Sequence, residues 1–207
     1  MEFAEVVRRR RSVRSYDSSK EVSDEQLKEL FELVKLSPSS YNLQPWEFVV
    51  VRDKKDRERL KACAHNQQHV GDASAAVIAL GTKNPSGRAD AIAADRIRKG
   101  LMSEEKKKKF EARVKAISED EAKARLWTVN STSLACMTLM LAAEDMGLAT
   151  CPMEGFDAEC VKKEFDIPKE YEVVMLITLG YAKREQPERP MRYGFEDIVH
   201  FEKLGKK

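Results

Sequence analysis

The stretch "EVVMLITLGYA", residues 172–182, decides the fold that this sequence predicts. It is a long run of aliphatic and β-branched residues whose single charge stands at its start. An uninterrupted apolar run of this kind is typical of a buried strand. We therefore expect residues 172–182 to form a core strand, with the other strands arranged around it.

Three other stretches have the composition of strands. "WEFVVVR", residues 46–52, has a continuous apolar centre, which predicts a strand covered on both faces. "SAAVIALGT", residues 74–82, predicts a second buried strand, and "LATCPMEGFD", residues 148–157, predicts a strand followed by a turn. Helical patterns separate these stretches, so an α+β chain is the economical interpretation.

Several helices have recognisable start and stop signals. Ser23 followed by Gln26 has the form of a capping box, and apolar residues then recur at helical spacing until Pro38 prevents continuation. Similar spacing predicts short helices at residues 2–9, 53–64 and 157–165.

A longer helical pattern precedes the strand expected at residues 148–157. Ser118 with Glu121 has the form of a second capping box, and the pattern continues through "LACMTLMLAAEDMG", residues 134–147, which is apolar on nearly every side. We expect this helix in the core or at a subunit interface. Gly147 is expected to end it, because glycine is favoured just after a helix.

The segment at residues 83–125 differs in composition from the rest of the chain. It is highly charged and rich in alanine, and it contains a run of lysines at residues 106–109. We expect exposed helical pieces here that form an insertion or a lid. Because the chain has no internal repeat and no clean linker, residues 1–207 are expected to form a single domain.

Composition excludes several classes of protein. The 37 Lys and Arg are set against 35 Asp and Glu, so the net charge of +2 is not that of a polyanion binder. No run approaches the roughly 20 apolar residues of a membrane span, and no signal peptide is recognisable. We therefore expect a soluble, cytoplasmic protein with no membrane or nucleic-acid partner. The cysteines show no C-x-x-C spacing and are interpreted as buried thiols: Cys63, Cys136, Cys151 and Cys160.

The sequence lacks the motifs that most forms of direct side-chain catalysis require. There is no G-x-G-x-x-G, no P-loop and no G-x-S-x-G elbow. His65 and His69 stand four apart, but no acidic or cysteine partner follows at metal-ligand spacing, so a zinc site is disfavoured and no metal is expected. With only three histidines, a hydrolytic triad is also disfavoured. These absences favour a cofactor that carries the chemistry.

Three short segments are hard to explain by packing alone. "RRSVR", residues 10–14, combines guanidinium groups with a hydroxyl and suits a phosphate, although taken alone a solvated helix end explains it equally well. "SPSSYNLQPW", residues 37–46, is either a loop that hydrogen-bonds a planar polar ring or a simple turn. "CPMEGFD", residues 151–157, has Gly155 where a backbone could approach a ligand, or it is an ordinary strand end.

Taken together and in this order, the three segments resemble the FMN-dependent nitroreductase family. The resemblance runs from about Arg8 to Val199 and includes the tail segment "ERPMRYGFEDIV", residues 188–199. It implies an α+β fold: a three-layer α/β/α sandwich with a mostly antiparallel central sheet, in a domain-interlocked homodimer.

The resemblance also implies roles for individual residues. The FMN phosphate and ribityl chain would be held by Arg10, Arg11, Ser12, Arg14, Arg189 and Arg192. A loop against the flavin of the partner subunit would use Pro38, Ser39, Ser40 and Asn42. The flavin ring would meet Asn66, His69, Pro152, Met153, Glu154 and Gly155, with the backbone N–H of Glu154 directed at N5. His69 stands where several relatives carry lysine, whereas Arg8 and Arg9 are left as a solvated helix end.

The implied activity is a ping-pong oxidoreduction: NADH or NADPH gives hydride to the flavin, and a small electron-poor acceptor such as a nitroaromatic or quinone takes it up. No protein residue is expected to act as a nucleophile. The alternatives are a reductive dehalogenase, flavin reductase or flavin-destroying enzyme of the same fold and, from another class, a nucleic-acid-binding module that uses the N-terminal arginines. Phe110 or Trp127 could form an aromatic gate, or both could simply pack helices together.

Overall fold

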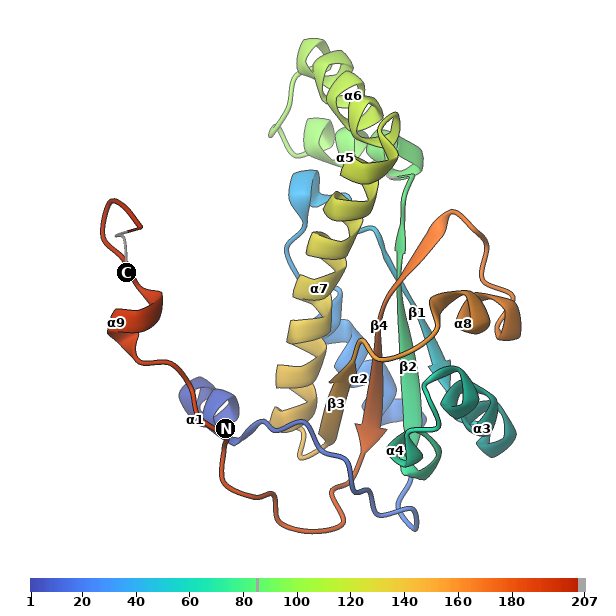
Figure 1. Cartoon of the computed structure of the whole chain (residues 1–207). Helices are drawn as coiled ribbons and strands as arrows, with labels where there is room; N and C mark the ends of the chain where they lie inside the picture. The colour runs from blue at the N-terminus through green and yellow to red at the C-terminus, as the bar shows by residue number, and fades with distance from the viewer. Residues whose placement is uncertain (85, 205–207) are drawn as a thin grey trace.

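The computed structural model describes residues 1–84 and 86–204 and is built around one antiparallel sheet (Figure 1). The strands lie in the order β1, β2, β4, β3. Their bounds are Trp46–Val51 (β1), Ala75–Thr82 (β2), Ala149–Met153 (β3) and Tyr171–Gly180 (β4). Strand β4 pairs with β2 on one side and β3 on the other, which confirms that residues 172–182 contain a core strand.

The edge strand β1 is less buried than its sequence predicts. It pairs with β2, from Trp46 opposite Gly81 to Val51 opposite Ala76. The two end residues of β1 are buried, Glu47 is exposed, and the three residues between are half-buried. Phe48 and Val50 pack against the core of one face and Val49 against the core of the other, so the strand is covered on both faces, but its centre is only half-buried because an edge strand has a neighbour on one side only.

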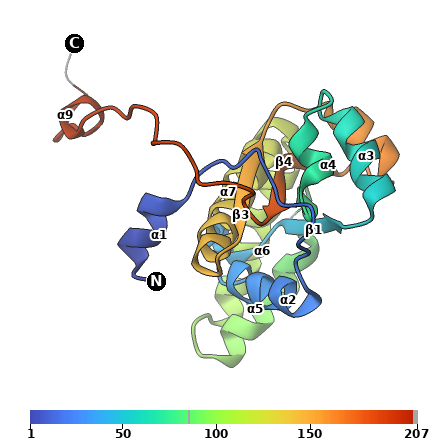
Figure 2. The same cartoon turned by 90° about the horizontal axis from the view of Figure 1, so that it is seen from below.

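Helices cover both faces of the sheet, which confirms the predicted three-layer α+β sandwich (Figure 2). Helices α2 and α7 pack on one face over a core that includes Leu139 and Ile177. Helices α3, α4 and α8 pack on the other face over a core that includes Leu60 and Leu176. The bounds of these helices are Asp24–Val34 (α2), Lys54–Cys63 (α3), Gln68–Asp72 (α4), Glu121–Asp145 (α7) and Ala158–Glu164 (α8). Because successive residues of β4 point to opposite faces, Leu176 and Ile177 contribute to different cores.

Helix ends follow the predicted local signals at Ser23 and Gly147 but not at Ser118. Ser23 and Gln26 exchange the hydrogen bonds of a capping box at the start of α2, at 3.1 and 3.2 Å. Gly147 follows α7 with a φ of 75°, as predicted for a residue that ends a helix. The capping box predicted at Ser118 is wrong, because Asp120 caps α7 instead and Ser118 is the last residue of the preceding helix. A carboxylate at this position also interacts favourably with the helix dipole.

The charged segment forms two helices, α5 (Ser86–Arg98) and α6 (Glu104–Ser118), beyond the sheet at the N-terminal end of α7 (Figure 1). They enclose a small apolar cluster in which Leu43 and Phe110 are buried and against which Trp127 packs. Both aromatic residues therefore pack helices together, which is the second of the two roles considered for them. That this helical pair acts as a lid stays a prediction.

Helix α7 is long and apolar enough, by length and composition, to cross a membrane. Half of its apolar window is buried, and the helix packs along the sheet. The core helix of a soluble protein has the same profile, and the packing of α7 is of that kind. Leu134 and Met137 nevertheless stay exposed on its outer side.

Two of the four cysteines are joined to each other. Cys63 at the end of α3 and Cys160 in the first turn of α8 form a disulfide. The prediction of buried free thiols is therefore wrong for this pair, because the two residues are 97 positions apart and only the packing of α3 against α8 brings them together. Cys136 and Cys151 are buried free thiols, as predicted.

Both ends of the chain extend from the same side of the body (Figure 2). These segments contain α1 (Phe3–Arg9) and, in the tail, α9 (Phe195–Ile198). Their large apolar side chains are exposed at Phe3, Val7, Met191, Tyr193, Phe195, Ile198, Phe201 and Leu204. Exposed apolar surface on this scale is typical of an interaction site.

Candidate functional site

The arginine-rich segment is held against strand β3. Ser12 forms an isolated parallel bridge with Thr150, and the N–H of Val13 donates to the Thr150 carbonyl at 2.9 Å. Val13 is buried in a small core that includes Ala149. Because the segment is extended, Ser12 and Arg14 fall on the side opposite to Val13.

One basic cavity of about 250 Å³ collects all six residues that the sequence assigned to a phosphate. Arg10, Arg11, Ser12 and Arg14 come from the start of the chain, and Arg189 and Arg192 come from its end. Gln186, Pro187, Glu188 and Pro190 complete the wall. The fold therefore brings together residues that are almost the whole chain apart.

Two of these arginines also close the end of helix α1. Nη1 of Arg11 donates to three carbonyls at the end of the helix, at 2.6 to 3.1 Å. Nη2 of Arg189 donates to three carbonyls of the same turn, at 2.8 to 3.1 Å. Cations stabilise the C-terminal end of a helix in this way. Sequence reasoning missed this second role, because the contact of the tail with α1 has no local signal.

The cavity concentrates positive charge. Nη1 of Arg10 and Nε of Arg11 are buried without a hydrogen-bond partner among the residues that the structure describes. The pKa of Arg189 lies below its ordinary value, first because of desolvation and then because of the neighbouring guanidinium groups. Glu188 is the one carboxylate among the residues that line the cavity. Buried donors without partners are costly, so this arrangement suits an anion with several acceptor oxygens.

A neutral imidazole lies next to this charge. His69 in α4 is only 5% exposed, and its Nε2 is buried with no hydrogen-bond partner in the described part of the chain. Its pKa is lowered, first by burial and then by the charge of Arg14, while Asp72 acts in the opposite direction. Any fixed positive charge here therefore belongs to Arg14. Asn66 is exposed in the turn before α4, with a left-handed φ of 57° that asparagine tolerates.

The loop after β3 approaches the same turn. Met153 is buried and Pro152 half-buried at the end of the strand, and Glu154 and Gly155 are exposed after it. Nε2 of Gln67 donates to the carbonyl of Gly155 at 2.9 Å and so joins the turn to the loop. Sequence reasoning missed Gln67, because nothing in the "HNQQH" segment indicates a partner 88 residues away.

The loop at residues 37–46 runs along α7 toward its N-terminal end, from Ser37, whose hydroxyl donates to the Thr138 hydroxyl at 2.8 Å. Leu43 belongs to the apolar cluster of α5 and α6, against which Trp127 packs near the start of α7. The end of α1 is tied instead to the last turn of α7, by an ion pair of 3.5 Å between Arg9 and Glu144. With 25 residues, α7 is about 37 Å long. Among the described residues of one chain, the four loop residues assigned to the flavin are not part of the lining of the basic cavity: Pro38, Ser39, Ser40 and Asn42.

The same loop has an unusual backbone. Tyr41, Asn42 and Gln44 have φ values of 58°, 60° and 45°. The hydroxyl of Ser39 accepts a hydrogen bond from the N–H of Gln44 at 2.9 Å, which holds the turn. Left-handed conformations of residues other than glycine cost energy and cluster at functional sites.

The chain is similar in sequence and in fold to several known proteins. The model of the family described as "Nitroreductase family" matches residues 7–181. "Putative NAD(P)H nitroreductase MhqN" of Bacillus subtilis (strain 168) is 36% identical over 200 residues, which cover 93% of this chain and 94% of that protein. The crystal structure of "putative nitroreductase ydfN" from Bacillus subtilis has a TM-score of 0.91 at 35% identity, covering 97% of this chain and 98% of that one. A "putative nitroreductase in complex with FMN" from Exiguobacterium sibiricum 255-15 has a TM-score of 0.87 at 28% identity, covering 97% of both chains.

Proposed function

The chain belongs to the nitroreductase family, and from that premise we propose that it is a homodimeric, FMN-dependent oxidoreductase. It takes hydride from NADH or NADPH and reduces a small electron-poor acceptor such as a nitroaromatic or a quinone. The observation that carries the proposal is the basic cavity, where arginines from both ends of the chain converge and two buried guanidinium nitrogens lack a partner within residues 1–84 and 86–204. The solved relative with bound FMN supports the choice of cofactor.

The residues of the cavity fit the phosphate of FMN. The unpartnered nitrogens of Arg10 and Arg11, together with the hydroxyl of Ser12, offer donors to a dianionic group. Arg192 adds charge from the tail. Arg189 contributes in a second way, because its contacts to α1 hold the wall of the cavity in place.

The turn before α4 and the loop after β3 would meet the flavin ring. Neutral His69 offers Nε2 as a hydrogen-bond partner, and Arg14 supplies the positive charge that favours reduced flavin. The backbone N–H of Glu154 would donate toward N5. When bound, FMN accepts hydride at N5 and passes it to the acceptor, so the chain has to position the ring and exclude water.

The loop at residues 37–46 would cover the FMN of the partner subunit. Two observations support a twofold dimer: the loop is remote from the basic cavity of its own chain, and apolar side chains lie exposed on several elements. Besides those at the chain ends, these include Leu33 in α2, Leu36 just after it, and Leu134 and Met137 in α7. Two equivalent sites per dimer then follow from the symmetry.

The arginine run does not have the geometry of a nucleic-acid arm. Arg9 pairs with Glu5 at 3.6 Å and with Glu144 at 3.5 Å, and Arg11 is turned toward the carbonyls of α1. Part of the run is therefore engaged within the chain, and the net charge of +2 further disfavours a polyanion as partner. The dehalogenase and flavin reductase alternatives share the cofactor site and differ in the acceptor.

Reconstitution tests the proposal directly. The dimer loaded with FMN should lose its flavin absorbance when NADH or NADPH is added without oxygen, and a nitroaromatic or quinone should restore it. A panel of acceptors that includes iodotyrosine-like compounds and free flavin distinguishes the alternatives of the same fold. Failure to bind FMN, or bound FMN that neither nicotinamide reduces, would contradict the proposal.

A further inference from the structure

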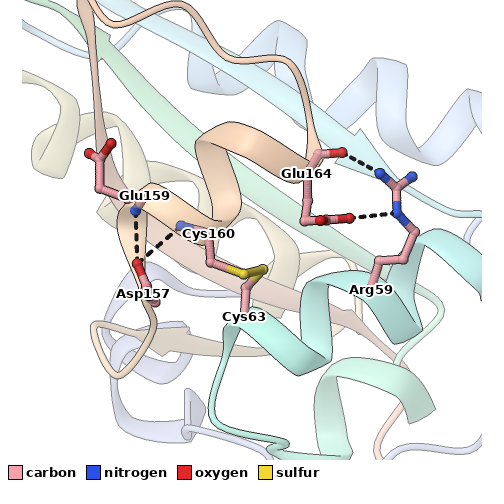
Figure 3. Close-up of a disulfide and its surroundings, with 6 residues drawn as sticks. All are labelled: Arg59, Cys63, Asp157, Glu159, Cys160 and Glu164. Atoms are coloured by element: carbon pink, nitrogen blue, oxygen red, sulfur yellow. Dashed lines mark hydrogen bonds and ion pairs between the residues drawn. A yellow bond between two sulfur atoms is a disulfide. The ribbon is translucent and has the colours of Figure 1, made fainter.

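The disulfide joins two segments that flank the proposed flavin site (Figure 3). Cys63 is the last residue of α3 and stands directly before the turn at residues 64–67. Cys160 lies in the first turn of α8, directly after the loop at residues 154–157. We call these two segments the ring loops, because they carry residues assigned to the flavin ring. The disulfide therefore connects the ring loops, although neither cysteine belongs to the proposed site.

Two hydrogen bonds connect the same region. The N–H of Asp157 donates to the carbonyl of Cys63 at 2.8 Å, and Nε2 of Gln67 donates to the carbonyl of Gly155 at 2.9 Å. The first ring loop is strained, since two consecutive residues other than glycine have φ values of 52° and 57°. A covalent bond beside this turn limits the unstrained backbone conformations that the turn could otherwise adopt. The disulfide therefore contributes to the order of both ring loops.

The far end of α8 is joined to α3 independently of the disulfide. Nε of Arg59 donates to Oε2 of Glu164 at 3.0 Å, and its Nη2 donates to the Glu164 carbonyl at 2.5 Å (Figure 3). The guanidinium also lies 5.5 Å from the ring centre of Phe165. Reduction of the disulfide would therefore leave α8 docked at its C-terminal end and loosen its N-terminal end, which adjoins the ring loops.

We propose that Cys63 and Cys160 form a redox modification site whose disulfide raises the affinity of the chain for FMN by ordering the ring loops. The co-reactant is a low-molecular-weight thiol together with its disulfide. The inference rests on the proposed function and adds to it a dependence on the thiol redox state. Binding gains affinity when loops are already ordered in the bound conformation.

Reduction proceeds by two thiol–disulfide exchanges. A small thiolate attacks Sγ of the half-buried Cys160, the bond to Cys63 breaks, and the Cys63 thiolate takes up a proton. A second small thiolate attacks the small-molecule sulfur of the mixed disulfide, which releases Cys160 to take up a proton and forms a small disulfide. Two electrons pass from the two small thiols to the protein disulfide, and oxidation is the reverse.

The coupling between disulfide and cofactor is reciprocal. Coupling between linked sites typically changes an affinity by roughly fivefold or more. If the oxidised chain binds FMN about fivefold more tightly, bound FMN must stabilise the disulfide by the same factor. This corresponds to a reduction potential lowered by about 20 mV for a two-electron couple.

The wild-type protein tests the proposal without substitution. It is equilibrated with oxidised glutathione or with a phosphine reductant, the state of Cys63 and Cys160 is determined by alkylation and mass spectrometry, and the Kd for FMN is measured. We expect a Kd roughly fivefold or more higher in the reduced state.

The double variant Cys63→Ser/Cys160→Ser should match reduced wild type under both conditions. Cys136→Ala removes a buried thiol from the other face of the sheet and should behave like wild type. An equal Kd in both states, or no disulfide after oxidation, overturns the proposal.

Amide hydrogen exchange of the FMN-free protein separates this inference from the proposed function. Reduction should increase exchange at residues 64–69 and 154–158, and residues around Glu164 should stay protected. Loss of FMN binding in both redox states would contradict the proposed function. FMN binding with equal exchange of the ring loops in both states would contradict the redox inference alone.

Discussion

The basic cavity and the loop at residues 37–46 form the two halves of the proposed site, and they are held in different ways. The cavity is assembled within one chain, because pairing with β3 places the arginine segment and the tail closes over it. The loop is anchored by the apolar cluster of α5 and α6, toward the opposite end of α7. Under the proposed function, one subunit would suffice to bind the phosphate, whereas covering the ring would require two.

Removal of donors from the cavity should have the largest effect. Arg10→Ala together with Ser12→Ala should weaken FMN binding roughly a hundredfold, because a hydrogen bond from a charged group contributes about 1.5–3 kcal/mol and a neutral one about 1 kcal/mol. Riboflavin, which lacks the phosphate, should lose little affinity. Fluorescence titration measures both, and Arg8→Ala is the matched control, since Arg8 lies outside this cavity. Equal losses for the two flavins would contradict the assignment.

Mixed dimers test whether the loop of one subunit completes the basic cavity of its partner. One chain carries Arg10→Ala and Ser12→Ala, the other carries Ser40→Ala and Asn42→Ala, and different affinity tags isolate the heterodimer. If each loop serves the cavity of its partner, one site contains both defects and the other contains none. We therefore expect one tightly bound FMN per heterodimer, counted by flavin absorbance. No tight site would mean that loop and cavity act within the same chain.

A moderate effect is expected from the charge beside the ring. Arg14→Gln should lower the reduction potential of bound FMN by roughly 20 mV, because loss of about 1 kcal/mol of electrostatic stabilisation corresponds to that shift for two electrons. Reductive titration against a reference dye measures the potential. Arg184→Gln, which removes an exposed cation outside the basic cavity, should leave it nearly unchanged. An unchanged potential in Arg14→Gln would mean that another group supplies the charge.

The smallest expected effect is the contribution of His69 to the pH dependence of the free energy of unfolding. Its pKa in the folded chain lies below its ordinary value of 6.5, because of burial and the charge of Arg14. As the pH falls below 6.5, the unfolded chain therefore binds this proton first, and the free energy of unfolding decreases until the pH is below the folded pKa. His69→Gln should remove this decrease. Urea unfolding of FMN-free protein at pH 8 and 5.5 checks it, and parallel pH profiles for the two proteins would contradict it.

Local patterns in the sequence predicted most of the secondary structure. The apolar runs at residues 74–82 and 172–182 and the capping box at Ser23 depend on neighbouring residues, and the structure confirms all three. The burial of β1 could not be predicted in this way, because it depends on its position at the edge of the sheet. The sequence predicts a capping box at Ser118, whereas Asp120 caps α7; serine and aspartate both favour such a position, and the neighbouring residues do not decide between them.

The sequence predicts which residues form the candidate site. It does not predict all the contacts that these residues make in the folded chain. The six residues assigned to the phosphate do line one cavity: Arg10, Arg11, Ser12, Arg14, Arg189 and Arg192. The contacts of Arg11 and Arg189 with α1, and of Gln67 with Gly155, have no local signature, because each depends on segments that meet only after folding. The roles of these residues toward FMN stay predictions.

By itself, the sequence determined the elements and the chemical character of the site. Apolar periodicity, helix caps and the clustering of Arg10–Arg14 are properties of neighbouring residues, so they can be recognised before the chain is folded. Only the tertiary structure decided which distant segments meet: the two chain ends at the basic cavity, Cys63 with Cys160, and the separation of the loop at residues 37–46 from that cavity. Such contacts follow from how the layers pack around β4, and the packing depends on the whole chain at once.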